Sequence, residues 1–197
     1  QPFFLYVHTI DPHVPYRPPA EFLALYADAN YSGPVSFARD IALLEKIKIG
    51  QMRLNEPDKR HLEALYDAEV TYHDAHFARI LAALAERRLE NDTLVVVTAD
   101  HGEEFWDHGS VGHGHSVYEE LVHVPLVVHL PGQNDPVRVT DPVGLIDVVP
   151  TVLETLGVVD GPTLPGQSLL GLASNGDRAN DPVVVSGFME GWRAANC

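Results

Sequence analysis

The amino-acid sequence predicts an α/β domain in which helices flank a layered sheet. Three short apolar runs, at residues 2–8, 93–98 and 123–128, are typical of buried strands. Two longer segments, residues 57–88 and 145–157, have the apolar spacing of helices. The resulting order of strand, helices, strand, strand and helix is that of α/β proteins. At 197 residues, the chain is long enough to bury a substantial core.

The first elements follow from local composition. The strand at residues 2–8 is predicted from its run of aromatic and aliphatic side chains. Four prolines within residues 11–19 exclude a helix or a central strand there, so we expect an ordered or semi-ordered loop. A short helix should begin at about Ala20 and a second helix should cover residues 36–49. The turn-forming residues 30–34 separate them.

The longest predicted helix, residues 57–88, places a stripe of side chains near one face, and we expect most of this stripe to form core. Its members are Leu62, Leu65, Glu69, Val70, His73, Phe77, Ile80, Leu81 and Leu84. In the later predicted helix, Pro150 should mark the first turn and Gly157 the end. Residues 161–181 are rich in Gly, Pro, Asn and Ser, so we expect a loop, followed by a last short strand at residues 183–185.

Composition narrows the classes of function. The formal net charge of −15 argues against binding to nucleic acid or to an anionic membrane, because either partner needs a basic face. No apolar run approaches the ~20 residues of a membrane helix. The only cysteine, Cys197, is the last residue, which excludes an intrachain disulfide and a firmly held cysteine nucleophile. An anionic substrate would then need local positive charge from a metal ion and from some of the eleven histidines.

The most informative segment is the end of the predicted strand at residues 93–98. Asp100 and His101 follow it, and ligands of open α/β sheets bind outside the carboxyl ends of strands, so we predict both residues as metal ligands. The alternative is a strand end followed by a turn, with His101 bonded only to backbone. A second histidine-rich loop, with His113 and His115, favours the metal site, because both loops adjoin buried strands and can face one site.

Several motifs in a fixed order resemble one known family. They are residues 2–6 leading to 12–16, the helical segment 66–74, residues 93–104, residues 112–125, and residues 146–157 with 166–170. Together they resemble the C-terminal part of the catalytic domain of an arylsulfatase-like sulfatase, in the alkaline phosphatase superfamily. The resemblance implies a mixed, mostly parallel sheet flanked by helices, with the site at the strand ends. It also implies that residues 1–197 form one partial domain, with residues 171–197 as its peripheral tail.

The resemblance implies metal-dependent hydrolysis of a small-molecule or glycan sulfate ester, usually with calcium. Asp100 and His101 match the later pair of metal ligands in the family, and the imidazole of His101 also suits Mn²⁺ or Zn²⁺. His13 matches a family histidine that contacts the sulfate and the leaving group. A further anion contact falls on His113 or His115, which both precede the Tyr-Glu pair. The flanking glycines favour His113.

The sequence departs from the family at the nucleophile. The family motif Cys/Ser-x-Pro-x-Arg, whose first residue becomes formylglycine, and an early pair of aspartates precede the segment that Pro2 matches, and this sequence contains neither. The chain also opens at Gln1 without an initiator Met, close to an apolar segment. We therefore expect a fragment that carries half of a composite site and is inactive by itself. The sequence leaves the compartment open, and the resemblance is compatible with a periplasmic or secreted parent protein.

Two other functions remain open from the sequence. A phosphonate monoester or phosphodiester hydrolase of the same superfamily resembles sulfatases in these loops, and the nucleophile would distinguish them. The alternative from another class is a non-catalytic protein that binds only a metal or an anionic ester. The sequence leaves the individual substrate and the oligomeric state open.

Overall fold

The computed structural model describes residues 2–35, 40–158, 161, 163–173, 188–189 and 192–193. They belong to two compact units. The first unit consists of Gln1–Glu86 and Glu104–Gly112, and the second consists of Arg87–Glu103 and His113–Cys197.

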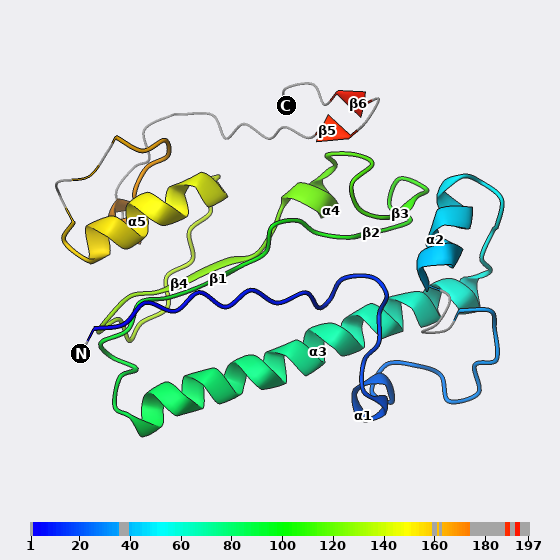
Figure 1. The fold of residues 1–197 in the computed structure, drawn as a ribbon, viewed down its shortest axis with the longest axis horizontal. Coiled ribbons are helices and arrows are strands. Elements are labelled where there is room, and N and C mark those ends of the chain that lie inside the picture. The colour runs from blue at the N-terminus through cyan, green and yellow to red at the C-terminus, as the bar shows by residue number, and fades with distance from the viewer. Residues whose placement is uncertain are drawn as a thin grey trace. The chain divides into compact units, whose positions relative to one another are not determined.

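Along the described part of the chain, three helices come first and three strands follow them, before the later helices and strands (Figure 1). The helices are α1 (Ala20–Leu23), α2 (Asp40–Lys48), α3 (Glu56–Glu86), α4 (Glu119–Val122), the 3₁₀ turn η1 (Leu145–Asp147), α5 (Val148–Thr155) and α6 (Leu170–Ala173). The strands are β1 (Val95–Thr98), β2 (Glu104–Phe105), β3 (Val111–Gly112), β4 (Leu126–His129), β5 (Phe188–Met189) and β6 (Trp192–Arg193). Strands of the described residues pair antiparallel, β1 with β4, β2 with β3 and β5 with β6, so this part of the chain contains no parallel pair.

The core of the first unit lies against the N-terminal half of α3. Leu62 and Leu65 of that helix are fully buried. The buried cluster around them also contains Tyr16, Val35, Leu43, Leu44 and Val111. Tyr66 packs edge-on against both Tyr16 and Phe105, with ring centroids 5.6 and 5.1 Å apart. These contacts join the proline-rich loop, α2, α3 and the β2–β3 hairpin in one core.

A reciprocal cap begins α3. The Asn55 side chain accepts the N–H of Asp58 at 2.9 Å, and the Asp58 carboxylate accepts the N–H of Asn55 at 3.3 Å. The hydroxyl of Tyr31 donates to the same carboxylate at 3.0 Å. A side chain at Gly33 would collide with Tyr31 and Asp58, so this packing requires glycine. The predicted start of the helix near Pro57 is therefore confirmed.

The predicted apolar stripe of α3 forms core only in part. Its first half is buried as described, whereas Val70, Ile80 and Leu81 are exposed by 43%, 37% and 40%. Phe22 of α1 packs edge-on against Tyr72, with ring centroids 5.2 Å apart. The prediction was wrong for Val70, Ile80 and Leu81. The spacing of apolar residues defines a face of a helix, but that face is buried only where other elements pack against it.

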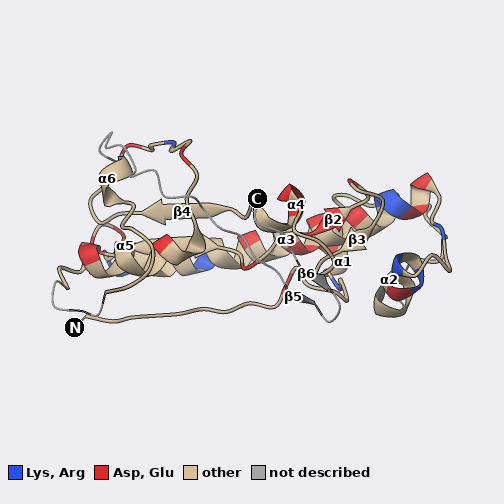
Figure 2. Ribbon diagram, turned by 90° about the horizontal axis from the view of Figure 1, so that it is seen from above, with Lys and Arg blue, Asp and Glu red and all other residues tan. Residues whose placement is uncertain are grey.

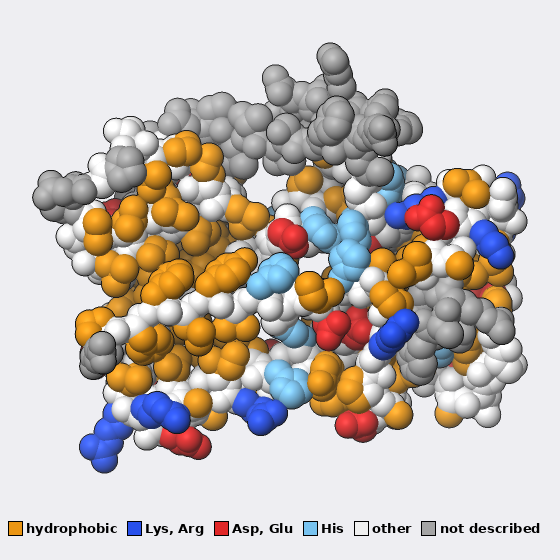
Figure 3. All heavy atoms as spheres, viewed as in Figure 1, with side chains coloured by type: hydrophobic (Ala, Val, Ile, Leu, Met, Phe, Trp, Pro, Cys, Tyr) orange, Lys and Arg blue, Asp and Glu red, His pale blue; other side chains and the backbone are white. Residues whose placement is uncertain are grey.

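The predicted buried strand at residues 2–8 was also wrong. Residues 2–10 are described without strand structure, and Phe4 and Tyr6 are exposed by 82% and 76%. An apolar run becomes a buried strand only where another strand pairs with its backbone and a core covers its side chains. Strand pairs of the described residues involve β1 to β6 only. Many hydrophobic side chains (orange) are exposed on the face drawn in Figure 3.

The β1–β4 pair forms a two-stranded sheet in the second unit, with Thr98 opposite Leu126. β1 confirms the strand predicted at residues 93–98. β4 begins at Leu126 and not at His123 as predicted, because Pro125 has no N–H with which to pair. The carbonyl of Pro125 instead accepts the hydroxyl of Thr98 at 2.8 Å. This contact ties the end of β1 to the start of β4.

The helix predicted at residues 145–157 is confirmed by η1 and α5. Pro150 lies in the first turn of α5, where its missing N–H has no partner to lose. Gly157 follows the helix with φ of 68°, a conformation that favours glycine. Both residues therefore have the positions that the sequence predicts.

Two buried polar side chains hold the start of α5 to the segment before α6. The Asp147 carboxylate accepts the N–H groups of Gly144 and Gln167, each at 2.8 Å. The Thr151 hydroxyl donates to the carbonyl of Asp147 at 2.7 Å and accepts the N–H of Leu169 at 2.9 Å. Because their partners are backbone groups, these side chains stabilise the fold.

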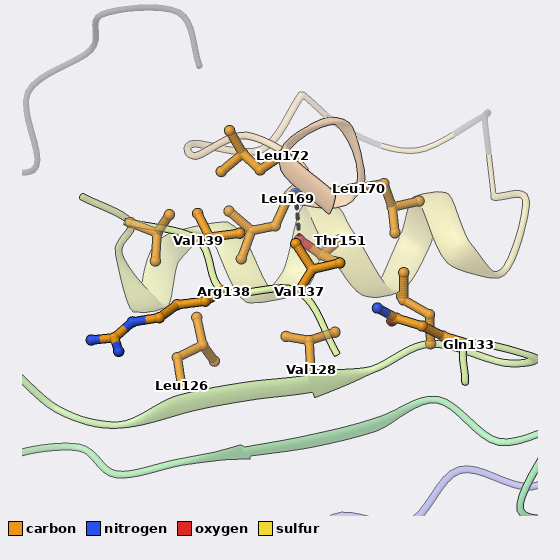
Figure 4. Close-up of a pocket in the computed structure, with 12 residues that line it drawn as sticks. Leu126, Val128, Gln133, Val137, Arg138, Val139, Thr151, Leu169, Leu170 and Leu172 are labelled. Atoms are coloured by element: carbon orange, nitrogen blue, oxygen red, sulfur yellow. Dashed lines mark hydrogen bonds between the residues drawn. The ribbon is translucent and has the colours of Figure 1, made fainter. Parts of the chain in front are cut away.

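A cavity of about 320 Å³ lies beside β4, α5 and α6 (Figure 4). It is lined by Leu126, Val128, Leu130, Gln133, Val137, Arg138, Val139, Val143, Thr151, Leu169, Leu170 and Leu172. These lining side chains include no carboxylate and no imidazole. The candidate metal ligands and general acids of the chain therefore lie outside this cavity.

The remaining predictions concern short elements. α1 confirms the helix expected from Ala20, and α2 confirms residues 40–48 of the helix expected at 36–49, of which residues 36–39 lie outside the described residues. α6 falls in the segment expected to be a loop. The strand predicted at 183–185 lies outside the described residues. Helices in the described part of the chain are too short or too polar to cross a membrane.

Candidate functional site

The backbone around Asp100 is held against α4. The N–H of Gly102 donates to the carbonyl of Leu121 at 2.9 Å. A side chain at Gly102 would collide with the backbone carbonyl of Glu120, so this close approach requires glycine. The glycine of the Asp-His-Gly triplet is thus required for the close packing of this backbone against α4.

Asp100 and His101 follow β1, and their side chains lie close together. The Asp100 carboxylate accepts the N–H of His101 at 3.1 Å, and its Oδ1 lies 3.9 Å from Nε2 of the imidazole. Nδ1 of His101 lies 2.8 Å from the carbonyl oxygen of Gly102. A carbonyl can only accept, so Nδ1 carries the proton and donates, and Nε2 is the nitrogen that lies nearer to Asp100. The backbone bond that the alternative interpretation expected is present, and it also orients the imidazole towards Asp100.

His113 joins this pair through Glu103. The rings of His101 and His113 lie 4.1 Å apart between centroids, at 30° to each other. Nδ1 of His113 is 3.1 Å from both carboxylate oxygens of Glu103, whose side chain is only 3% exposed. The second unit therefore brings together Asp100, His101, Glu103 and His113. The sequence analysis missed Glu103, although its position directly after the Asp-His-Gly triplet is the signal that could have found it.

His115 lies two residues further along the same loop and is partly buried. The segment from Asp100 to His123 contains five other acidic residues and no Lys or Arg. Two of these acidic residues, Glu119 and Glu120, begin α4 (red in Figure 2). Positive charge for an anion can therefore come, within this segment, only from histidines or from a bound cation.

Glu104 has a different partner set from its neighbour Glu103. It belongs to the first unit and is fully buried. Its carboxylate accepts the N–H groups of His108 and Ser110, each at 3.0 Å. These bonds close the turn between β2 and β3, in which Trp106 has φ of 69°. Glu104 is therefore a residue of the fold.

His13 lies in the proline-rich loop of the first unit. Its Nδ1 is 2.8 Å from the carbonyl oxygen of Val14, so this nitrogen donates and Nε2 carries any other contact. The loop is anchored to α3, because the N–H of Arg17 donates to the carboxylate of Glu69 and Tyr16 is fully buried. The expected ordered loop is thus confirmed, and His13 has a fixed support.

Comparison with known proteins decides the family. A family model described as Sulfatase matches residues 1–158. The chain belongs to the sulfatase family. The resemblance that the sequence motifs indicated is therefore confirmed.

Curated relatives of this sulfatase chain agree. It is 30% identical over 174 residues to the uncharacterized sulfatase YidJ of Escherichia coli, covering 86% of this chain and 35% of that protein. It is 37% identical over 123 residues to mouse arylsulfatase K, covering 62% of this chain and 22% of the relative. The chain thus spans about a third or less of the length of these relatives.

Solved structures confirm the α/β, alkaline phosphatase-like fold of the sulfatase chain. A phosphonate monoester hydrolase from Silicibacter pomeroyi superposes with a TM-score of 0.63 at 27% identity. The match covers 87% of this chain and 33% of that structure.

Sulfatases generally use a metal ion and a formylglycine. The residues of this sulfatase fit a metal, because Asp100 supplies a carboxylate and His101 has its Nδ1 proton directed to backbone. Histidine ligands of metals commonly donate their other ring N–H to a carbonyl in this way. The donor set itself therefore supports the predicted ligand pair.

Proposed function

We propose that the complete sulfatase hydrolyses sulfate esters at a metal site that includes Asp100 and His101. The observation that carries this proposal is the orientation of the His101 imidazole, with Nδ1 at the Gly102 carbonyl and Nε2 at 3.9 Å from Asp100 Oδ1. A bound divalent metal would neutralise the ester oxygens and favour attack by the nucleophile. Among the described residues, Asp100 and His101 are the pair that we assign to it.

We assign Ca²⁺ as the first choice of metal. The exposed carboxylate of Asp100 is a hard oxygen ligand of the kind that Ca²⁺ prefers. The imidazole of His101 also suits Mn²⁺ and Zn²⁺, which are therefore the alternatives to test. The formylglycine nucleophile is expected outside this sequence, in which the motif that generates it is not present.

The histidines supply the contacts to the anion in this proposal. His113 is the residue of the second loop that lies beside His101, so it is assigned to the sulfate in preference to His115. Either it or His13 can deliver a proton to the leaving alcohol, a contribution of ~10²- to 10⁴-fold in rate for a placed general acid. His13 keeps this role by its match to the family motif and by its anchored loop.

The proposed substrate is a sulfate ester of a small molecule or a glycan. Human iduronate 2-sulfatase is 29% identical to this chain over 150 residues, covering 67% of the chain and 27% of that protein. Its name favours a sulfated sugar as the first compound to test. The negative net charge of −15 agrees with a compound that carries few sulfate groups better than with a polyanion.

Hydrolysis of a phosphonate monoester or a phosphodiester is the second candidate function. Two solved phosphonate monoester hydrolases, from Silicibacter pomeroyi and Agrobacterium radiobacter, are each 27% identical to the chain, with TM-scores of 0.63 and 0.56. A metal beside histidines would suit either ester, because both present anionic oxygens.

Hydrolysis of an aryl sulfate and an aryl phosphonate by the complete protein tests these proposals. We expect EDTA to abolish hydrolysis, Ca²⁺ to restore it, and kcat/KM to be higher for the sulfate. Restoration by Mn²⁺ or Zn²⁺ but not by Ca²⁺ would assign that metal to the site in place of Ca²⁺. A higher kcat/KM for the phosphonate would favour the second candidate function. Metal binding without hydrolysis of either ester would contradict both and leave the non-catalytic alternative.

A further inference from the structure

Glu103 is a buried carboxylate that contacts the imidazole of His113. Both of its oxygens lie 3.1 Å from Nδ1, and its side chain is 3% exposed, whereas that of His113 is 21% exposed. We infer that Glu103 is a positioning residue, which fixes the ring of His113 and directs Nε2 to the substrate. The inference rests on the proposed function, because it concerns the contact of His113 with the ester.

The chemistry of the two groups sets the direction of this hydrogen bond. An ionised carboxylate has no proton to donate, so Nδ1 of His113 must be the donor. Nδ1 then carries its proton in both charge states of the imidazole, and a proton can be exchanged with the ester only at Nε2. A ring with two rotatable bonds is thereby held to one orientation and one assignment of its nitrogens.

A second Glu–His pair in the same unit is exposed to solvent and serves as a comparison. Glu119 and His123 lie one helical turn apart, with Nδ1 3.3 Å from the carboxylate, and their side chains are 84% and 77% exposed. Exposed pairs of this kind contribute little, because water competes for both groups. Glu103, in contrast, is shielded from water and joins two loops that are ten positions apart in sequence. Glu119 therefore provides a matched control.

The kinetic test compares Glu103→Ala, Glu103→Gln and Glu119→Ala in the complete protein, with an aryl sulfate as substrate. Glutamine keeps a carbonyl oxygen that accepts the Nδ1 proton, whereas alanine removes the acceptor. We expect Glu103→Ala to lower kcat/KM by ~10- to 100-fold, through both kcat and KM, as for other residues that orient a functional histidine. Glu103→Gln should recover most of this loss, and Glu119→Ala should have no effect.

Two outcomes would overturn the inference. Equal losses in Glu103→Gln and Glu103→Ala would assign the effect to charge and not to orientation. Unchanged kcat and KM in Glu103→Ala, with only a lower melting temperature, would assign Glu103 a purely structural role.

A spectroscopic measurement separates this inference from the proposed function. In the full chain labelled with ¹⁵N-histidine, two-bond ¹H–¹⁵N correlations report which nitrogen of His113 carries the proton, and His113→Gln assigns the signals. We expect a protonated Nδ1 in the wild type and in Glu103→Gln, and mixed protonation of the two nitrogens in Glu103→Ala. An unprotonated Nδ1 in the wild type would contradict the inference. Failure of the complete protein to hydrolyse any ester would instead contradict the proposed function and leave this result intact.

Discussion

The loop after β1 and the β2–β3 hairpin are neighbours in the chain, yet their carboxylates have different partners. Those of the loop lie beside imidazoles, and the carboxylate of Glu104 in the hairpin accepts backbone N–H groups. At the turn, the carboxylate of Glu104, the first residue of β2, is fully buried and accepts two backbone N–H groups. In the loop, Asp100 is exposed beside the imidazole of His101, and Glu103 contacts the side chain of His113. A carboxylate that is bound to backbone stabilises the fold, whereas one that faces solvent or orients an imidazole can serve a ligand. The partner therefore indicates the role better than the residue type.

The largest effect that would sharpen this comparison is the loss of metal binding in Asp100→Ala. We expect the affinity of the complete protein for Ca²⁺ to fall by more than ~100-fold, because a direct ligand is lost. Without metal, the free energy of unfolding should change by less than ~0.5 kcal/mol, because the Asp100 side chain is 83% exposed. Calorimetric titration and urea unfolding measure the two quantities. The exposed Asp135 gives the control Asp135→Ala, and equal affinity in both variants would remove Asp100 from the site.

Asp100 and His101 could be predicted because their position depends on local sequence. A buried strand that ends in an Asp-His-Gly triplet places both side chains by itself, and β1 forms as the apolar run predicts. The contact of Glu103 with His113 depends on the path of a ten-residue excursion, which includes two-residue strands too short to have a periodic pattern. Secondary structure of that length is set by its neighbours.

The fold shows the same division between local and distant causes. The spacing of apolar residues predicted α3 and α5, and Pro150 and Gly157 marked the ends of the latter. The apolar run at residues 2–8 matched β1 in composition, yet it is exposed and forms no strand. A strand requires a partner, and the identity of that partner is not encoded in the strand's own residues.

A loss of stability in Glu104→Leu should be the next largest effect. Leucine has a similar size but leaves the N–H groups of His108 and Ser110 without their acceptor, at a cost of ~1–3 kcal/mol for each that stays buried. Urea unfolding measures this loss, and Glu119→Leu is the control, because that side chain is 84% exposed. The comparison also requires an unchanged affinity for Ca²⁺ in Glu104→Leu. A large drop in that affinity would make Glu104 part of the metal site.

The smallest effect concerns His61, a histidine of the first unit that has no place in the proposed site. Its ring stacks on Tyr31 with centroids 3.8 Å apart. Burial lowers its pKa below the ordinary 6.5, against the opposing charge of Asp58. As the pH drops below about 6.5, His61 therefore takes up a proton in the unfolded chain before it does so in the folded chain. The free energy of unfolding decreases over this range, until the pH has passed below the lowered pKa of the folded state.

The variant His61→Phe tests this contribution, because phenylalanine can keep the stacking on Tyr31 and cannot titrate. We expect the difference in free energy of unfolding between wild type and variant to be constant above pH 7. As the pH falls below 6.5, the wild type should lose stability relative to the variant. Urea unfolding at a series of pH values measures this difference. A difference that stays constant down to pH 5 would mean that His61 titrates alike in both states and contributes nothing to the pH dependence of stability.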